Sequence, residues 1–180
     1  MDVRRVVTGH DATGRAVVTS DEIVEPITAD LSPAWEWHRL WGVDGRPGFP
    51  DDGAAPGAHA YFPPSVGHRF GFFTVPPNDR ARLPADLDLE AALAQFEERL
   101  PGLASHVEPD GAGMHTTATI DYGVVLAGEV TLELDDGVRV SLRAGDTYVQ
   151  NGTRHRWTNE GDEPAVIAVV LIGADHAKVG

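Results

Sequence analysis

The chain has 180 residues, of which 42% are hydrophobic and 23% charged, and this length is enough for one domain with a sizeable core. Its formal net charge of −14 argues against nucleic acid and against an anionic membrane surface as partners, because an acidic chain repels both. The absence of cysteine excludes disulfides and thiolate metal sites. No apolar run reaches the length of a signal peptide or a transmembrane helix, which predicts a cytoplasmic protein.

The N-terminal part of the chain predicts short strands. Two β-rich runs, 3–8 and 15–20, are separated by a turn that contains Gly and Asp, and this pattern indicates a hairpin. Residues 35–43 predict a strand with an aromatic face formed by three of the four tryptophans: Trp35, Trp37 and Trp41. Such a face either stacks against a ligand or packs in a core or dimer interface, and we favour packing. His38 has the opposite parity and is predicted at the surface.

A long irregular stretch and a helix follow. Residues 44–64 are rich in Pro and Gly and have no periodicity, which predicts a loop long enough to cover the mouth of a barrel. Residues 68–75 have apolar side chains on both faces and indicate a central strand. Residues 88–100 predict the one convincing helix, packed on the outside of the barrel. Its apolar stripe has spacings of four, three and four residues: Leu89, Leu93, Phe96 and Leu100.

From residue 113 onward, short alternating runs are separated by turn signals every eight to twelve residues. These predicted strands are 120–126, 129–134, 138–143, 147–150, 154–158 and 165–172. The pattern favours an all-β fold, a single antiparallel β-barrel or jelly roll with an N-terminal extension of strands and one α-helix. The sequence contains no internal repeat, so a duplicated barrel does not fit.

Alternate positions between residues 111 and 129 place four polar side chains on one face of an extended strand: His115, Thr117, Thr119 and Asp121. If the strand that carries His155 lies alongside, two imidazoles and one carboxylate come together. Two His and one carboxylate are the ligand set of open mononuclear metal sites. The alternative is a surface His, a turn Asp and a core His that bind nothing.

These two stretches resemble the two motifs of the cupin superfamily, G-x5-H-x-H-x3-4-E-x6-G and G-x5-P-x-G-x2-H-x3-N. In the first motif, His115 matches the first His, Asp121 stands at the Glu position and Gly128 closes the motif. The second motif is matched at four positions: Gly145, Gly152, His155 and Asn159. The resemblance covers residues 105–173. It implies a cupin core there, with residues 1–104 as an extension packed on the barrel, 174–180 as a tail, and one structural domain overall.

The chain departs from the family pattern at three positions. Thr117 occupies the position of the second His, Asp121 replaces Glu, and Gln150 or Asn151 stands where Pro is expected. A complete cupin site holds three His and one Glu, so the resemblance leaves three candidate metal ligands and catalytic residues: His115, Asp121 and His155. They would bind Fe, Mn, Ni or Zn, and no organic cofactor is expected. Asp is one methylene shorter than Glu, so Asp121 either completes the site or orients a His in a pocket without metal.

Three functions fit this site, each with a small-molecule ligand. The first is a metal-dependent enzyme of dioxygenase, decarboxylase, dehydratase or isomerase type, acting on a small oxygenated organic substrate. The second is a metal-free isomerase, in which His155 or His115 paired with Asp121 is the general base and Tyr148 the acid, since Tyr122 has the wrong parity. The third is a ligand-binding cupin without turnover.

Further predictions concern substrate contacts and assembly. We expect four residues to contact the substrate: Thr117, Thr119, Arg154 and Trp157. Arg154 or Arg156 would bind an anionic substrate, because the acidic chain offers little other attraction for anions. The aromatic residues of the N-terminal half exceed what one small barrel needs inside, and this excess predicts a homodimer.

Overall fold

The computed structural model describes residues 2–55, 57–110 and 112–177. Gly111, at the start of the first motif stretch, and residues 178–180 of the expected tail lie outside the described residues. Among the described residues, no helix is long and apolar enough to cross a membrane. The strands are β1 (Val3–His10), β2 (Ala16–Val24), β3 (Ile27–Ala29), β4 (Ser32–Val43), β5 (His68–Val75), β6 (Thr119–Ala127), β7 (Glu129–Glu133), β8 (Arg139–Arg143), β9 (Thr147–Asn151), β10 (Arg156–Thr158) and β11 (Ala165–Gly173). The helices are α1 (Leu89–Arg99) and two 3₁₀ turns, η1 (Ala104–His106) and η2 (Asp135–Gly137).

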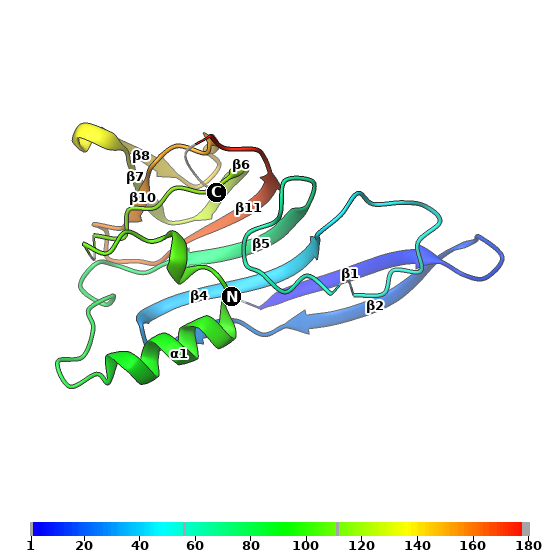
Figure 1. Ribbon diagram of the computed structural model, residues 1–180, viewed down its shortest axis with the longest axis horizontal. Helices are drawn as coiled ribbons and strands as arrows, with labels where there is room; N and C mark the ends of the chain where they lie inside the picture. The colour runs from blue at the N-terminus through cyan, green and yellow to red at the C-terminus, as the bar shows by residue number, and fades with distance from the viewer. Residues whose placement is uncertain (1, 56, 111, 178–180) are drawn as a thin grey trace.

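Two antiparallel sheets form the body of the molecule. The larger sheet has the strand order β3-β4-β5-β11-β6-β9, and the smaller has the order β10-β7-β8 (Figure 1). The main hydrophobic core contains side chains from both sheets, such as Val130 of β7, Val125 of β6 and Ile167 of β11. This arrangement confirms the predicted all-β fold, a cupin-type jelly roll with strands before it and one α-helix.

Half of the larger sheet comes from the N-terminal part of the chain. β4 and β5 pair antiparallel, and β5 pairs with β11, so strands far apart in sequence are neighbours in space. Along β11 the burial alternates strictly, with Ala165, Ile167, Val169 and Leu171 turned inward. The N-terminal strands therefore complete the wall of the barrel.

The first hairpin and the long loop form a connected unit beside the barrel. β1 and β2 pair antiparallel and project from the body (Figure 1). The backbone N–H of His10 donates to the carbonyl of Asp51 at 2.7 Å, and a Cβ at Gly9 would lie 2.5 Å from the backbone of Asp52. The loop between β4 and β5 is therefore fastened to the hairpin over part of its length.

Helix α1 begins where predicted but turns a different face to the core. The carboxylate of Asp88 accepts hydrogen bonds from the backbone N–H groups of the first turn, as an N-cap does. Leu89 and Leu93 are 61% and 49% exposed, so this part of the predicted apolar stripe is wrong. The buried side chains follow a spacing of four: Ala92, Phe96 and Leu100. The reason is that α1 packs against β3, η1 and one side of the core, which a narrow line of side chains covers.

Candidate functional site

A cavity of about 360 Å³ lies inside the barrel. It contains five titratable side chains: Tyr61, His115, Asp121, Tyr148 and His155. Its apolar wall is mainly aromatic and includes Trp35, Trp37, Phe62, Phe73, Phe96 and Trp157. Such a cavity, apolar with a few convergent polar groups, is typical of a small-molecule site.

The two motif histidines are paired neighbours in the wall of the cavity. His115 and His155 form an isolated antiparallel bridge, in which each backbone N–H donates to the other residue's carbonyl at 2.9 Å. Their ring centroids are 4.2 Å apart. The convergence that the sequence predicted for these imidazoles is therefore a consequence of backbone pairing between the two motifs.

Each imidazole is oriented by a carbonyl two residues before it. Nδ1 of His115 lies 3.0 Å from the carbonyl oxygen of Gly113, and Nδ1 of His155 lies 2.8 Å from that of Thr153. Nδ1 of each ring therefore carries the proton, and Nε2 of each has no partner among the described residues. Burial lowers the pKa of both histidines, and with the added charge of His115 it lowers the pKa of His155 to about 3. Both rings are neutral at physiological pH.

Asp121 is a buried carboxylate in the cavity wall. Its side chain is 7% exposed, and its Oδ1 is buried without a hydrogen-bond partner within the described ranges. Burial raises the pKa of Asp121 to about 6, while the hydroxyl of Thr119 acts in the opposite direction. A buried carboxylate oxygen without a partner costs free energy, and groups of this kind are concentrated at functional sites.

Two tyrosines stand near the Asp121 carboxylate. Burial, and next the charge of Asp121, raise the pKa of Tyr61 and of Tyr148, so both phenols stay protonated and able to donate. Tyr148 comes from β9 and was predicted as an acid. Tyr61 comes from the long loop, whose lack of periodicity did not place it at the site. Tyr122 is 48% exposed on the opposite face of β6.

The ring of Tyr148 reaches the cavity across a glycine. Gly123 pairs with Tyr148 between β6 and β9, and a Cβ at Gly123 would lie 2.2 Å from the tyrosine ring. We expect Gly123→Ala to push Tyr148 out of place and to lower the free energy of unfolding by about 1–3 kcal/mol, as overpacking does. Denaturant unfolding measures the loss. Gly45→Ala, where a Cβ meets open space, is the matched control, and equal stability of the two variants would contradict the expectation.

The predicted substrate contacts are only partly in the cavity. Trp157 lines it and packs against the ring of Tyr148, with centroids 4.9 Å apart. The hydroxyls of Thr117 and Thr119 bond to each other at 2.8 Å, and both residues are almost fully buried. Neither threonine lines the cavity, so their side chains form part of the support behind it.

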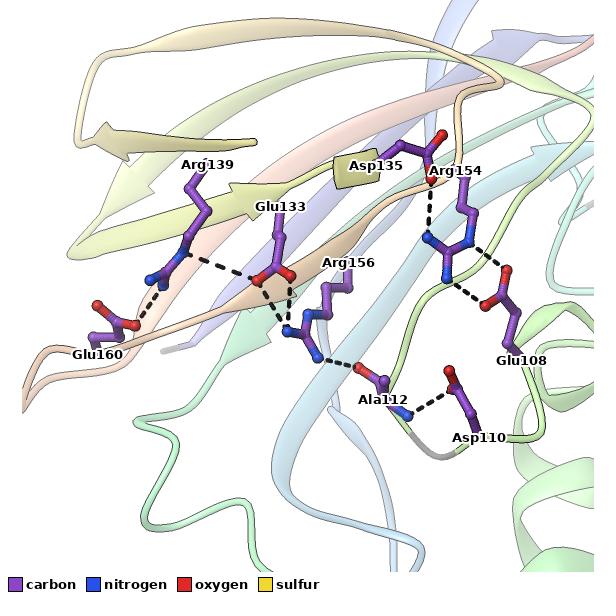
Figure 2. A network of polar contacts seen from close by, with 9 residues as sticks. All are labelled: Glu108, Asp110, Ala112, Glu133, Asp135, Arg139, Arg154, Arg156 and Glu160. Atoms are coloured by element: carbon purple, nitrogen blue, oxygen red, sulfur yellow. Dashed lines mark hydrogen bonds and ion pairs between the residues drawn. The ribbon is translucent and has the colours of Figure 1, made fainter. Parts of the chain in front are cut away.

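Arg154 is held in a network of polar contacts (Figure 2). Its guanidinium donates to both carboxylate oxygens of Glu108 at 2.6 Å and to Asp135 at 2.9 Å. Arg156, on the other side of His155, donates to Glu133 and to the backbone carbonyl of Ala112. Both arginines are thus engaged with the protein, and they fasten the segment that leads to His115.

This network predicts a local effect of breaking it. We expect Arg154→Met to loosen residues 107–114, because the side chain of Glu108 loses its partner. The hydrogen bond from the backbone N–H of Glu108 to the carbonyl of Met114 then opens more easily. Faster amide hydrogen exchange in this segment, with little change elsewhere, is the expected result. Arg139→Met removes a cation from the same surface without touching the segment, and comparable acceleration in that control would contradict the expectation.

The second motif also supplies structural hydrogen bonds. Gln150, one of the two residues that stand where Pro is expected, donates from Nε2 to the carbonyl of Thr153 at 3.1 Å, and this carbonyl orients His155. Asn159 is fully buried and donates from Nδ2 to the carbonyls of Val75 and Glu163. Gln150 and Asn159 thus hold in place the turns before and after β10.

The three predicted metal ligands do not form a complete ligand group. Two features of His115 and His155 suit metal ligands: Nε2 of each ring has no partner among the described residues, and a backbone carbonyl orients each ring. Across the described part of the chain, however, no group of three or more His, Asp or Glu side chains is gathered closely enough to hold a metal ion. Asp121 lines the same cavity, but it and the two imidazoles do not form such a group. The donor set as it stands therefore does not fit a resident metal.

The fold and the cavity define the class: a small β-barrel with an internal cavity. The chain belongs to the cupin superfamily. Residues 105–171 match a family model described as Cupin domain. The cupin-domain-containing oxidoreductase srdB of Neurospora crassa is 37% identical over 177 residues, which cover 95% of this chain and 74% of that protein.

Other relatives match over shorter segments. Oryzines biosynthesis cluster protein J of Aspergillus oryzae is 35% identical over 89 residues, 42% of this chain and 50% of that protein. Phomopsin biosynthesis cluster protein C' of Diaporthe leptostromiformis is 54% identical over 54 residues, 29% of each chain. The match thus spans half or less of the length of these two relatives. Among solved structures, the cupin domain of Schizosaccharomyces pombe Cnp3 has a TM-score of 0.49 at 8% identity, and the likeness covers 96% of this chain and 89% of that one.

Proposed function

We propose that this cupin is an enzyme that moves a proton on a small oxygenated organic molecule bound in the barrel cavity. The observation that carries the proposal is the buried carboxylate of Asp121: the residue lines the cavity, and its Oδ1 has no hydrogen-bond partner among the described residues. A purely structural core rarely keeps such an atom, because it pays the desolvation cost without a hydrogen bond. The names of the relatives, oxidoreductases and biosynthesis cluster proteins, agree with chemistry on a small molecule.

The roles follow from the protonation states. With a pKa of about 6, Asp121 is mostly ionised at neutral pH and can accept a proton from a carbon next to a substrate carbonyl. The phenol of Tyr148 can donate a hydrogen bond to the carbonyl oxygen as negative charge develops there. The same proton returns from Asp121 to a second carbon, so the reaction is an isomerisation and needs no redox partner. The neutral imidazoles of His115 and His155 accept hydrogen bonds from substrate hydroxyls.

The aromatic wall indicates the substrate class. Trp35 and Trp157 offer flat apolar surfaces, and the cavity volume of about 360 Å³ suits a molecule of one or two rings. Trp37 is 6% exposed and belongs to the core as well as to the cavity wall, so the packing that the sequence favoured and the ligand wall coexist. We therefore propose as the substrate an aromatic compound that carries an unsaturated ketone, because the reaction needs a C–H next to the carbonyl and a conjugated second carbon that accepts the proton.

Solvent deuterium exchange tests the proposal. Small carbonyl compounds are incubated with the protein in D₂O under air, and mass spectrometry follows deuterium at carbon. We expect Asp121→Asn to reduce exchange by about 10²-fold or more and Tyr148→Phe to reduce it less, since general base catalysis has this size. Tyr122→Phe, on the outer face of the same strand as Asp121, should leave exchange unchanged.

The competing candidate is a ligand-binding cupin without turnover. Thr117 favours it, because the position of the second motif His holds a hydroxyl that is bonded within the protein. Binding and turnover are therefore measured together in the natural protein, in His155→Ala and in Thr117→His. Tight binding without any transformation, under air and with Fe, Mn, Ni or Zn supplied, would defeat the enzyme proposal.

Elemental analysis decides whether a metal takes part. The names of the relatives are compatible with a metal cofactor, and none of them specifies one. Since the donor set is incomplete, we expect protein purified without a His tag to hold no stoichiometric Fe, Mn, Ni or Zn. A stoichiometric metal that is lost in His115→Ala would contradict this expectation and restore the metal-dependent alternative. Thermal stabilisation by added metal is the second measurement.

We also propose that two copies pair through the outer face of the larger sheet. A cross-strand row of apolar side chains crosses four strands of this face: Phe70, Val170, Tyr122 and Val149. Several are well exposed, with Val149 at 58% and Tyr122 at 48%. Exposed apolar surface of this extent favours association. Light scattering at micromolar concentration should give the mass of a dimer, Val149→Glu should give a monomer, and a monomeric natural protein would refute the proposal.

A further inference from the structure

A second cavity, of about 200 Å³, lies at the free edge of β4. β3 pairs with β4 only as far as Trp37, and a bulge follows between Arg39 and Trp41. From the first hairpin, the guanidinium of Arg5 donates to the carbonyl of Leu40 at 2.7 Å and lies over the ring of Trp41, 5.8 Å from its centroid. The hairpin and the edge of the sheet thus enclose a space that the barrel cavity does not include.

Three arginines line this second cavity, and only two of them have carboxylate partners. Arg5 forms an ion pair with Glu22, and Arg69 forms one with Asp44. Arg39 forms no ion pair within the described residues. In a chain with a net charge of −14, this cavity therefore has one positive charge in excess.

The guanidinium of Arg39 has donors to spare. Its Nη2 donates to the backbone carbonyls of residues 58, 59 and 60 at 3.0–3.2 Å. Its Nε and Nη1 have no partner in the described part of the chain. Burial, and after it the charge of Arg69, lower the pKa of Arg39, as expected for a cation that lacks a nearby anion. An arginine stays protonated even so, and a bound carboxylate would form a charge-assisted hydrogen bond with it.

Two residues that border this cavity also have a buried polar atom without a partner among the described residues. His38 is 3% exposed and its Nε2 has no hydrogen bond, and Nε of Arg5 is likewise buried without one among the described residues. The sequence predicted His38 at the surface, and this prediction is wrong. The reason is that β2 lies against β4 and Arg5 of β1 reaches the same edge, so the hairpin covers this part of the outer face.

We propose that the second cavity binds a small aromatic carboxylic acid. The carboxylate pairs with Arg39, and the ring lies against lining residues on the same side of the sheet as Arg39: Ala58, Tyr61, Val169 and Leu171. One unpaired cation balances one negative charge, which favours a carboxylate over a phosphate dianion. The small volume limits the ligand to about one ring.

This site is distinct from the barrel cavity and adjoins it. The two cavities share four wall residues: Trp37, Tyr61, Val169 and Leu171. A ligand at Arg39 therefore contacts the shared wall from one side, and Asp121 lies on the other side of this wall, in the barrel cavity. The proposal concerns binding alone, so it stands or falls independently of the proton-transfer reaction.

Isothermal titration with benzoate tests the proposal on the natural protein. We expect saturable binding below about 10 mM, at least about tenfold weaker binding of the neutral analogue benzamide, and no comparable binding of inorganic phosphate. Arg39→Met should weaken benzoate binding by about tenfold or more. Arg99→Met is the matched control, because Arg99 also donates to a backbone carbonyl, that of Thr28, but lies outside the cavity.

A second variant keeps the test decisive if Arg39→Met does not fold. Ala58→Leu fills the cavity and leaves the guanidinium of Arg39 in place, so benzoate binding should be lost while the fold is kept. Asp121→Asn should leave benzoate affinity unchanged. Equal affinity for benzoate and benzamide, or benzoate binding that survives Ala58→Leu and changes in Asp121→Asn, would overturn the proposal and place the ligand in the barrel cavity.

Discussion

Replacing Asp121 with Asn is expected to stabilise the protein at neutral pH. Burial raises the pKa of Asp121 to about 6 from an ordinary value of 3.8. Between these values the folded state holds a proton that the unfolded state has lost, so the stability that Asp121 contributes is fully present below pH 3.8 and is lost as the pH rises to 6. Two pKa units correspond to about 3 kcal/mol, which is the upper limit of the gain above pH 6.

Urea unfolding between pH 4 and pH 8 measures this effect. The difference in unfolding free energy between Asp121→Asn and the natural protein should grow from pH 4 to pH 6 and then stay constant. Asp162→Asn, at an exposed turn, should show no such growth. A variant that gains stability while proton exchange on the substrate is lost is the pattern expected of a group kept for function at a cost in stability. Loss of stability at all pH values would contradict the environment described for Asp121.

The second large effect is acid destabilisation caused by His155. Burial, with a smaller effect of His115, lowers the pKa of His155 to about 3 from 6.5. The stability that depends on its neutral form is fully present above pH 6.5 and is lost as the pH falls toward 3. The loss at its limit is about 5 kcal/mol, and the lowered pKa of His115 adds to it with the same sign.

His155→Gln removes this titration and should flatten the dependence of stability on pH below 6.5. Asp121 acts with the opposite sign between pH 3.8 and 6, so the comparison is made in the Asp121→Asn background, which removes this opposing effect. His59→Gln, in an exposed part of the long loop, should change nothing. An unchanged acid slope in His155→Gln would show that His155 is not kept neutral by burial.

Much of the fold follows from local pattern. The alternation of apolar and polar residues identified the strands from β6 to β11, and the turn signals placed their ends within a few residues, because side chains of a strand point to opposite faces in turn. For α1, periodicity gave the bounds but not the face. Leu89 and Leu93 are as apolar as a core requires, yet they are exposed, since burial depends on what the helix packs against.

The candidate site divides in the same way. The two motifs determined that His115 and His155 belong to one site, and parity determined that Asp121 and Trp157 turn toward the interior and Tyr122 away from it. Sequence spacing determines which face of a strand each side chain is on and in which order the strands follow, because both depend only on the local backbone.

Tertiary structure alone decided the distances between elements. It left Asp121 and the two imidazoles without the arrangement of a metal-ligand group among the described residues, brought Tyr61 from an aperiodic loop to the cavity, and engaged Arg154 with Glu108 rather than leaving it for a substrate. It also buried His38 beneath the first hairpin. Each of these outcomes depends on the packing of segments far apart in the chain, because a contact within a few ångströms is set by the shapes of both partners, and one strand's pattern describes only its own side of the contact.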